Sequence, residues 1–183
     1  MPQIYFEHYR KTFMHRLIQF LARSTALLGG IILLVLVLIM TVTILGRSTG
    51  LGEVTGSYEL LEAGIAFAIF SFLPITQFYG AHATVDVFTS FLPERANRWI
   101  AAFWEVVLLL VILLVVWRLY EGTLSHFKRG GTTTFLQFPL WWPYTASCIA
   151  GLVACVTAAY CAAMRILEAL RNSNVLPSEH VEH

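Results

Sequence analysis

The feature that most constrains this chain is an uncharged apolar run from Ser24 to Gly46. A helix of about 20 mostly apolar residues is long enough to cross the roughly 30 Å hydrocarbon core of a bilayer. The run meets that length with no charged residue from end to end. It therefore predicts a membrane-spanning helix.

Three later segments meet the same length criterion. The four expected spans cover about residues 24–46, 57–80, 99–120 and 139–164. Membrane-barrel strands would alternate apolar and polar residues, and these segments do not. The chain is 57% hydrophobic and only 13% charged, whereas about a quarter of residues are charged in soluble domains. The predicted fold class is an all-α integral membrane protein with four transmembrane helices.

The distribution of Lys and Arg predicts the orientation, because short cytoplasmic loops carry an excess of them. Eight lie before the first span, between the second and third, or after the fourth, and four lie on the other side. Both termini and the connection that contains His82 are therefore expected to be cytoplasmic. Residues 24–165 would form the membrane domain, and residues 166–183 a flexible cytoplasmic tail.

Residues 1–23 carry apolar side chains at helical spacing, with basic residues off that stripe. The apolar positions are Ile4, Phe6, Tyr9, Phe13, Leu17, Phe20 and Leu21. This pattern predicts an amphipathic helix that lies on the inner membrane surface. The alternative is an N-terminal extension of the first spanning helix that projects into water.

The sequence offers little support for an enzyme. The three cysteines all fall in the fourth expected span and form no Cys-x-x-Cys pair, which a thiol oxidoreductase would need. All six histidines lie outside the four apolar cores, whereas a haem held between helices needs inward histidines. No cofactor or metal site is expected, and a net charge of +1 does not favour nucleic-acid binding.

Ionisable residues inside the spans are functional candidates by default. Glu59 and Glu62 are three residues apart near the predicted periplasmic end of the second span, and Glu105 lies near the cytoplasmic end of the third. The positive end of the helix dipole could stabilise the two carboxylates, or the glutamates could contact another subunit. A role as ligands of a coupling ion ranks third. None of the three lies at the midplane, where a self-contained transporter would be expected to place such groups.

The connection after the second span contains His82 and Asp86, four residues apart. In a helical turn this spacing places both side chains on one side, where Asp86 could orient His82 and favour its charged form. The segment ends before Pro93 and is predicted to be a short interfacial helix or turn.

An ordered set of features resembles one known family. Arg47 follows the first span, Ser57-x-Glu59 opens the second, and Gly80-x-His82-x-x-Val85-Asp86 comes after it. Leu92-Pro93 and Phe138-Pro139-Leu140-Trp141 follow in order. With four spans, this set is similar to the small permease subunit of tripartite ATP-independent periplasmic (TRAP) transporters, the DctQ-type family. The resemblance covers about residues 20–165.

The resemblance implies a role in transport at the bacterial inner membrane. In this family the small subunit forms a heterodimer with a large permease, and a periplasmic binding protein delivers an organic acid. Import is driven by a sodium gradient, and the large subunit carries the substrate and ion sites. The small subunit is thus expected to be a scaffold surrounded by membrane lipid.

The resemblance also implies residue roles. Arg47, His82, Asp86 and Trp141 match family positions and would anchor loops or contact the large subunit. Family members often have consecutive acidic residues at the start of the second helix, whereas here Leu60 and Leu61 separate Glu59 from Glu62. Both glutamates are therefore candidates for that position.

Two other functions are compatible with four spans. The first is a self-contained, homodimeric small transporter that uses an embedded carboxylate, for which Glu62 or Glu105 would serve. The second is the membrane anchor of a redox complex, which the absence of histidines from the apolar cores disfavours.

Overall fold

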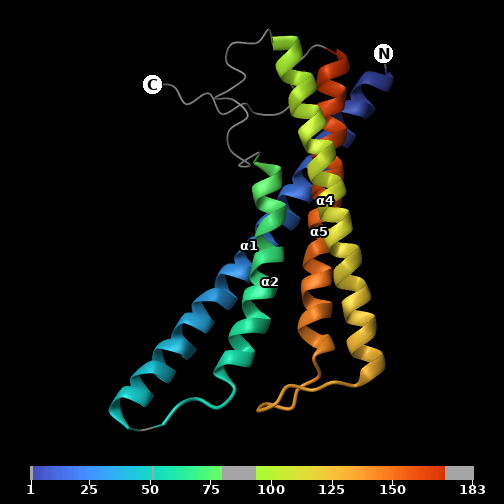
Figure 1. Ribbon diagram of the computed structural model, residues 1–183. Helices are drawn as coiled ribbons and strands as arrows, with labels where there is room; N and C mark the ends of the chain where they lie inside the picture. Colours follow the sequence, from blue (N-terminus) through green and yellow to red (C-terminus); the bar gives the residue numbers. More distant parts are fainter. Residues whose placement is uncertain (1, 51, 80–93, 172–183) are drawn as a thin grey trace.

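The computed structural model describes residues 2–50, 52–79 and 94–171. These residues form four long helices, in chain order α1 (Pro2–Thr49), α2 (Ser57–Phe78), α4 (Glu94–Arg129) and α5 (Trp141–Arg171). All four are long and apolar enough to cross a membrane, as the sequence predicts. Successive helices run in opposite directions (Figure 1), so that the start of α1 and the end of α5 lie at the same end of the molecule.

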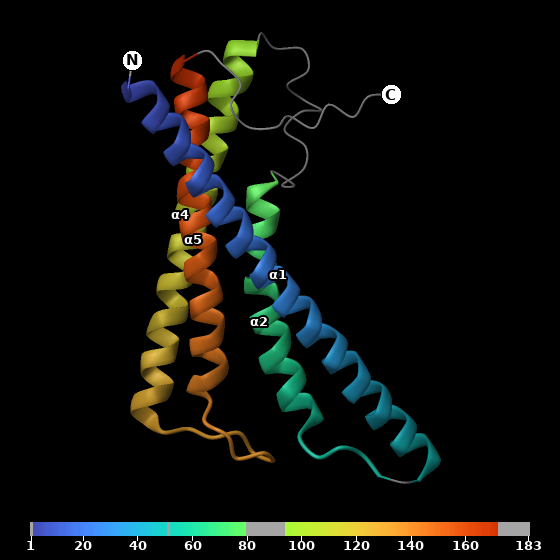
Figure 2. The ribbon, with the colours of Figure 1, turned by 180° about the vertical axis from the view of Figure 1, so that it is seen from behind.

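Helix α1 is one unbroken helix of 48 residues. At 1.5 Å per residue its length is about 72 Å, more than twice the hydrocarbon core of a bilayer. It crosses the other helices on a steep diagonal (Figure 2). Residues 2–23 are thus helical as predicted, but they continue the first spanning helix, with no boundary between Arg23 and Ser24. Their position relative to a membrane surface stays a prediction.

Small residues allow α1 and α2 to pack closely. Buried α1 positions recur every seven residues, at Ala22, Gly29, Leu36 and Thr43. A Cβ atom added to Gly29 would lie 2.8 Å from the Cβ of Ser71, and one added to Gly64 would lie 2.6 Å from the Leu36 side chain. Glycine at these positions lets the two backbones approach, which is a common basis of helix association in membranes.

Helix α5 packs against α4 and α2, and the main apolar cluster lies along it. The buried members of the cluster are Ile112, Val116, Cys148, Ala154, Cys155 and Ala158. Gly151 lies under Val116 of α4, because an added Cβ would come within 2.7 Å of that side chain. All three cysteines are free and buried, in keeping with their interpretation as small apolar residues of a helix.

Helices α4 and α5 continue beyond the residues expected to span the membrane. Helix α4 ends at Arg129, nine residues after the expected end of the third span at Tyr120, and the start of α5 packs against its last turns. The His126 and Tyr144 rings lie 4.7 Å apart, and the Phe127 and Trp141 rings 5.5 Å apart. Helix α5 continues to Arg171, into the segment expected to be a tail, and residues 172–183 lie outside the described residues.

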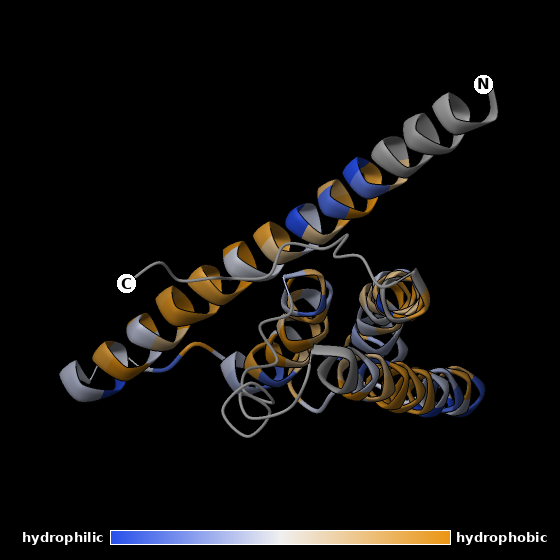
Figure 3. Ribbon diagram, turned by 90° about the horizontal axis from the view of Figure 1, so that it is seen from above, coloured by the Kyte–Doolittle hydropathy of each residue, from blue (hydrophilic) through white to orange (hydrophobic). Residues whose placement is uncertain are grey.

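The outer surfaces of the helices are strongly apolar. Many large hydrophobic side chains are exposed, among them Leu34, Leu38, Leu110 and Leu114. Figure 3 shows the hydrophobic stretch along the middle of α1, with hydrophilic residues towards its ends. An apolar exterior over helices of this length fits a lipid environment, and it identifies an integral membrane protein.

Candidate functional site: polar contacts at the two ends of the helices

Glu59 in the first turn of α2 binds the connection between α4 and α5. One carboxylate oxygen accepts a hydrogen bond from the backbone N–H of Phe135 at 2.8 Å, and the other from that of Leu136 at 3.0 Å. Two adjacent N–H groups thus hold both oxygens of one carboxylate. Hydrogen bonds to an ionised acceptor are stronger than those between neutral groups. Glu59 therefore fastens the α4–α5 connection to the start of α2, and we call this contact the Glu59 clamp.

The connection is folded so that its N–H groups can reach Glu59. The backbone N–H of Thr133 donates to the carbonyl of Phe138 at 3.0 Å, and that of Leu140 donates to the carbonyl of Gly131 at 3.0 Å. The chain between these bonds turns back on itself, with Gln137 at a φ of 55°. Residues 134–136 form the tip of this turn, which lies near the start of α2 (Figure 1).

Gly56 completes the clamp on the α2 side. Its φ is +76°, a left-handed conformation that side chains disfavour, and an added Cβ atom would lie only 2.5 Å from the Leu136 side chain. Leu136 therefore packs directly against the backbone of Gly56. Both the backbone conformation and the close approach require glycine at this position.

Glu62 has a different environment, although only three residues separate it from Glu59. Its side chain is exposed, and no hydrogen bond or ion pair joins it to the part of the chain that the structure describes. Three residues on a helix correspond to a rotation of about 60° between side chains. That rotation is enough to direct Glu59 towards the α4–α5 connection and Glu62 away from the other helices.

Arg47 lies in the last turn of α1, where the negative end of the helix dipole stabilises a positive charge. Its side chain is exposed. An open pocket of about 560 Å³ lies at the same end of α1; Arg47 does not line it, and its lining residues are Val42, Leu45, Gly46, Thr49, Gly52, Glu53 and Val54.

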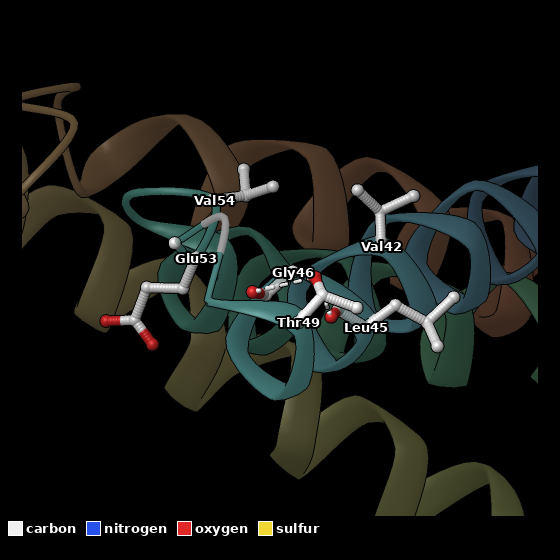
Figure 4. Close-up of a pocket in the computed structure, with 7 residues that line it drawn as sticks. Val42, Leu45, Gly46, Thr49, Glu53 and Val54 are labelled. Carbon is white, nitrogen blue, oxygen red and sulfur yellow. Dashed lines mark hydrogen bonds between the residues drawn. The ribbon is translucent and has the colours of Figure 1, made fainter.

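The pocket has little capacity to hold a polar ligand. The Thr49 hydroxyl donates to the carbonyl of Leu45 at 2.8 Å and is therefore used within the helix. The carboxylate of Glu53 points away from the other lining residues (Figure 4). Gly46 lies tightly under the carbonyl of Gly52. The pocket thus marks where α1 turns towards α2.

Trp141 is the first residue of α5. Its ring meets those of Phe127 and Trp142 edge to face, with ring centres 5.5 and 6.1 Å away. Edge-to-face contacts of this kind favour a fixed arrangement of the rings. Trp141 thus packs the start of α5 against the end of α4. The other two candidates, His82 and Asp86, lie outside the described residues.

A second polar contact, which the residue pattern alone does not predict, lies towards the opposite end of the helices. The side-chain amide nitrogen of Gln77 on α2 donates to the carboxylate of Glu105 on α4. Gln77 is only 1% exposed, and its backbone carbonyl accepts a hydrogen bond from the Cys161 thiol of α5 at 3.6 Å. Arg165 of α5 interacts electrostatically with Glu105. We call these four residues the Gln77–Glu105 cluster; it joins three helices.

One signal could have pointed to this cluster. Gln77 and Glu105 are polar residues in apolar surroundings, and both are expected near the cytoplasmic membrane boundary. Polar groups buried in a membrane generally find partners on neighbouring helices. However, the choice of partner depends on how α2, α4 and α5 are rotated, which the sequence does not specify. The amide oxygen of Gln77 is buried and has no partner among the described residues.

A third contact joins α1 to the end of α2. The Tyr79 hydroxyl accepts hydrogen bonds from the side chains of Gln19 at 3.3 Å and Arg23 at 2.8 Å. These hydrogen bonds, first from Gln19 and then from Arg23, lower the pKa of the Tyr79 hydroxyl. The His15 ring lies 5.0 Å from that of Phe78, so that aromatic packing supports the same junction.

Glu59, the Gln77–Glu105 cluster and Tyr79 each connect separate segments of the chain. Within the described ranges, no group of three or more His, Cys, Asp and Glu residues could hold a metal ion. Glu59 and Glu105 each accept hydrogen bonds from a different segment of the chain. The arrangement can therefore fix the relative positions of the helices.

Comparison with known proteins identifies the family. The family model described as "Tripartite ATP-independent periplasmic transporters, DctQ component" matches residues 36–171, which is most of the chain. No match was found among curated proteins or among solved structures. The matched range includes α2, α4, α5, the Glu59 clamp and the Gln77–Glu105 cluster. The chain therefore belongs to the DctQ family, the small permease component of TRAP transporters.

Proposed function

We propose that this chain is the scaffold subunit of a sodium-driven importer of an organic acid. It would bind one large permease subunit in the bacterial inner membrane, and a periplasmic binding protein would deliver the substrate. Membership of the DctQ family supports the assignment to a tripartite transporter. Sodium coupling and the class of substrate come from the family resemblance.

The observation that carries the scaffold role is the use of two carboxylates in helix contacts. Glu59 binds the α4–α5 connection to α2, and Glu105 binds α4 to Gln77 of α2. A carboxylate that carried an ion or proton through a transport cycle would have to exchange its partners. Carboxylates that hold helices together instead favour a rigid body, against which a moving permease domain could work.

Reconstitution into sodium-loaded and sodium-free vesicles tests this proposal. Alone, the chain should transport no organic acid when a sodium gradient is applied. Co-expressed with its large subunit, it should copurify in a one-to-one complex, and that complex should take up substrate with the binding protein present. Uptake by this chain alone would instead support the self-contained transporter.

Variants can separate scaffolding from substrate recognition. Gln77→Leu removes the Gln77–Glu105 hydrogen bond. It should lower both the yield of the assembled complex and its rate of substrate uptake. Its order of preference among organic acids should stay the same, because the large subunit would carry the substrate site. A changed order of preference would contradict the scaffold role.

A further inference from the structure

Helix α2 has one face that no described part of the chain covers. Its exposed positions are Tyr58, Glu62, Ile65 and Ile69, which recur at spacings of four, three and four residues and so lie on one side of the helix. Tyr58 is 60% exposed and Ile69 is 57% exposed. We call this face the outer stripe of α2.

The other sides of α2 are occupied. Gly64, Ala68 and Ser71 pack against α1. Phe70, Leu73 and Gln77 face α5. Helix α1 lies behind α2 in Figure 1 and in front of it in Figure 2, so that one side of α2 is open to the viewer in Figure 1.

Glu62 makes this stripe different from an ordinary lipid-facing surface. It belongs to the candidate membrane span Ser57–Phe78, and it lies about 7.5 Å along the helix from Ser57 at 1.5 Å per residue. A charged side chain that faces hydrocarbon is costly, and such residues usually face a partner or a water-filled cavity. The described residues supply no cation and no hydrogen-bond donor to Glu62.

The other carboxylates near this end show that Glu62 is an exception. Glu59 holds two backbone N–H groups, and Glu121 pairs with Arg118 at 3.1 Å. Glu53 is exposed too, but it lies in the connection between α1 and α2, outside the spans. Glu62 is thus a carboxylate on an apolar membrane face to which the described residues offer neither a cation nor a hydrogen-bond donor.

We propose that the outer stripe of α2 is a docking surface for a transmembrane helix of the large permease subunit, and that this helix brings a Lys or Arg side chain to Glu62. The inference rests on the proposed function, because it takes the permease as the partner. A basic side chain is the occupant that charge complementarity favours. Ile65 and Ile69 would pack against the apolar part of the same helix, and Tyr58 would lie at its boundary with water.

Charge variants of Glu62 test the electrostatic part of the proposal. The full chain would be copurified with its large subunit in a mild detergent. Glu62→Lys should lower the yield of the complex at least tenfold, and Glu62→Gln should lower it less. Glu53→Gln is the matched control, since it removes an exposed carboxylate at the same end and should leave the yield unchanged. Thermal unfolding of each isolated variant checks that the chain still folds.

Site-specific crosslinking tests the surface without changing Glu62. Benzoylphenylalanine placed at Ile65 or Ile69 should crosslink to the large subunit in membranes. The same group at Leu114, which is 58% exposed on α4, serves as a control position and should crosslink to that subunit at least fivefold less.

Three results would overturn the docking surface. The first is a wild-type yield of complex for Glu62→Lys, the second is crosslinks from Ile65 and Ile69 to lipid, and the third is crosslinks to a second copy of this chain. In each case the wild-type chain could still copurify with the large subunit, and the proposed function would stand. If the wild-type chain did not copurify at all, the proposed function would fail, and the docking surface would fail with it.

Discussion

At the scale of single residues, two nearby glutamates have separate roles. Glu59 is bound by two backbone N–H groups of the α4–α5 connection, whereas Glu62 is exposed on the outer stripe of α2. They are only three residues apart, yet a rotation of about 60° around the helix directs them to different surroundings. The clamp indicates a fold-stabilising role for Glu59, and the exposure of Glu62 leaves it available to another chain.

Glu59→Gln should loosen the connection between α4 and α5. The glutamine amide has one acceptor oxygen, whereas the carboxylate has two. Its NH₂ group is only a donor, so one of the two hydrogen bonds from the backbone N–H groups would be lost. Limited proteolysis in detergent should cut residues 131–140 several-fold faster than in the wild type. Glu62→Gln is the control, and its cleavage rate should match the wild type. Equal cleavage rates for both variants would show that the clamp does not hold the connection.

At the scale of elements, the presence and apolar character of each helix were predictable, but its ends and its neighbours were less so. The third span is expected to end at about Tyr120, and α4 continues as a helix to Arg129, where its last turns make ring contacts with α5. The N-terminal stripe correctly predicted helix for residues 2–23, but not its continuity with the first span. Such features depend on contacts between segments, which periodicity alone does not show.

Gly29→Ala should weaken the packing of α1 against α2. The new Cβ atom would lie 2.8 Å from that of Ser71, and overpacking of this kind typically costs about 1–3 kcal/mol. Gly30→Ala is the matched control, because nothing lies within 4 Å of an added Cβ there. Its stability should stay equal to the wild type or rise slightly, since alanine favours helix. Thermal unfolding in detergent measures both, and equal midpoints for the two variants would contradict the close approach.

The Gln77–Glu105 hydrogen bond should appear as coupling between α2 and α4. In a double-mutant cycle of Gln77→Leu and Glu105→Leu, we expect a coupling free energy of about 1–2 kcal/mol. Reversible unfolding in mixed micelles would measure it. A control cycle of Gln77→Leu with Cys148→Ala, which lies elsewhere on α5, should be additive. Additivity within about 0.3 kcal/mol in the first cycle would show that the bond contributes no stability.

At the scale of the whole molecule, the four helices place both described ends of the chain at one end of the structure. The Glu59 clamp lies at one end of the helices and the Gln77–Glu105 cluster towards the other. Together they fix α2 relative to α4 and α5. The excess of Lys and Arg predicts which end faces the cytoplasm.

Labelling of engineered cysteines in intact cells tests this orientation. In a background in which the three buried cysteines are replaced by alanine, a membrane-impermeant reagent should label Glu53→Cys and Thr134→Cys from outside. Thr89→Cys should be labelled only after the cells are opened. Labelling of Thr89→Cys in intact cells would contradict the predicted topology and indicate the opposite orientation, but it would not contradict the helical fold.

The sequence by itself determined that the protein lies in a lipid bilayer, how many helices span it, and the family. Apolar length and residue order are properties of each segment alone, so they can be read without knowing the fold. Only the tertiary structure decided which polar groups meet. Glu59 and its donors are separated by 76 and 77 residues, and Gln77 and Glu105 by 28. Pairing over such distances depends on the rotation and tilt of each helix, which packing between helices sets.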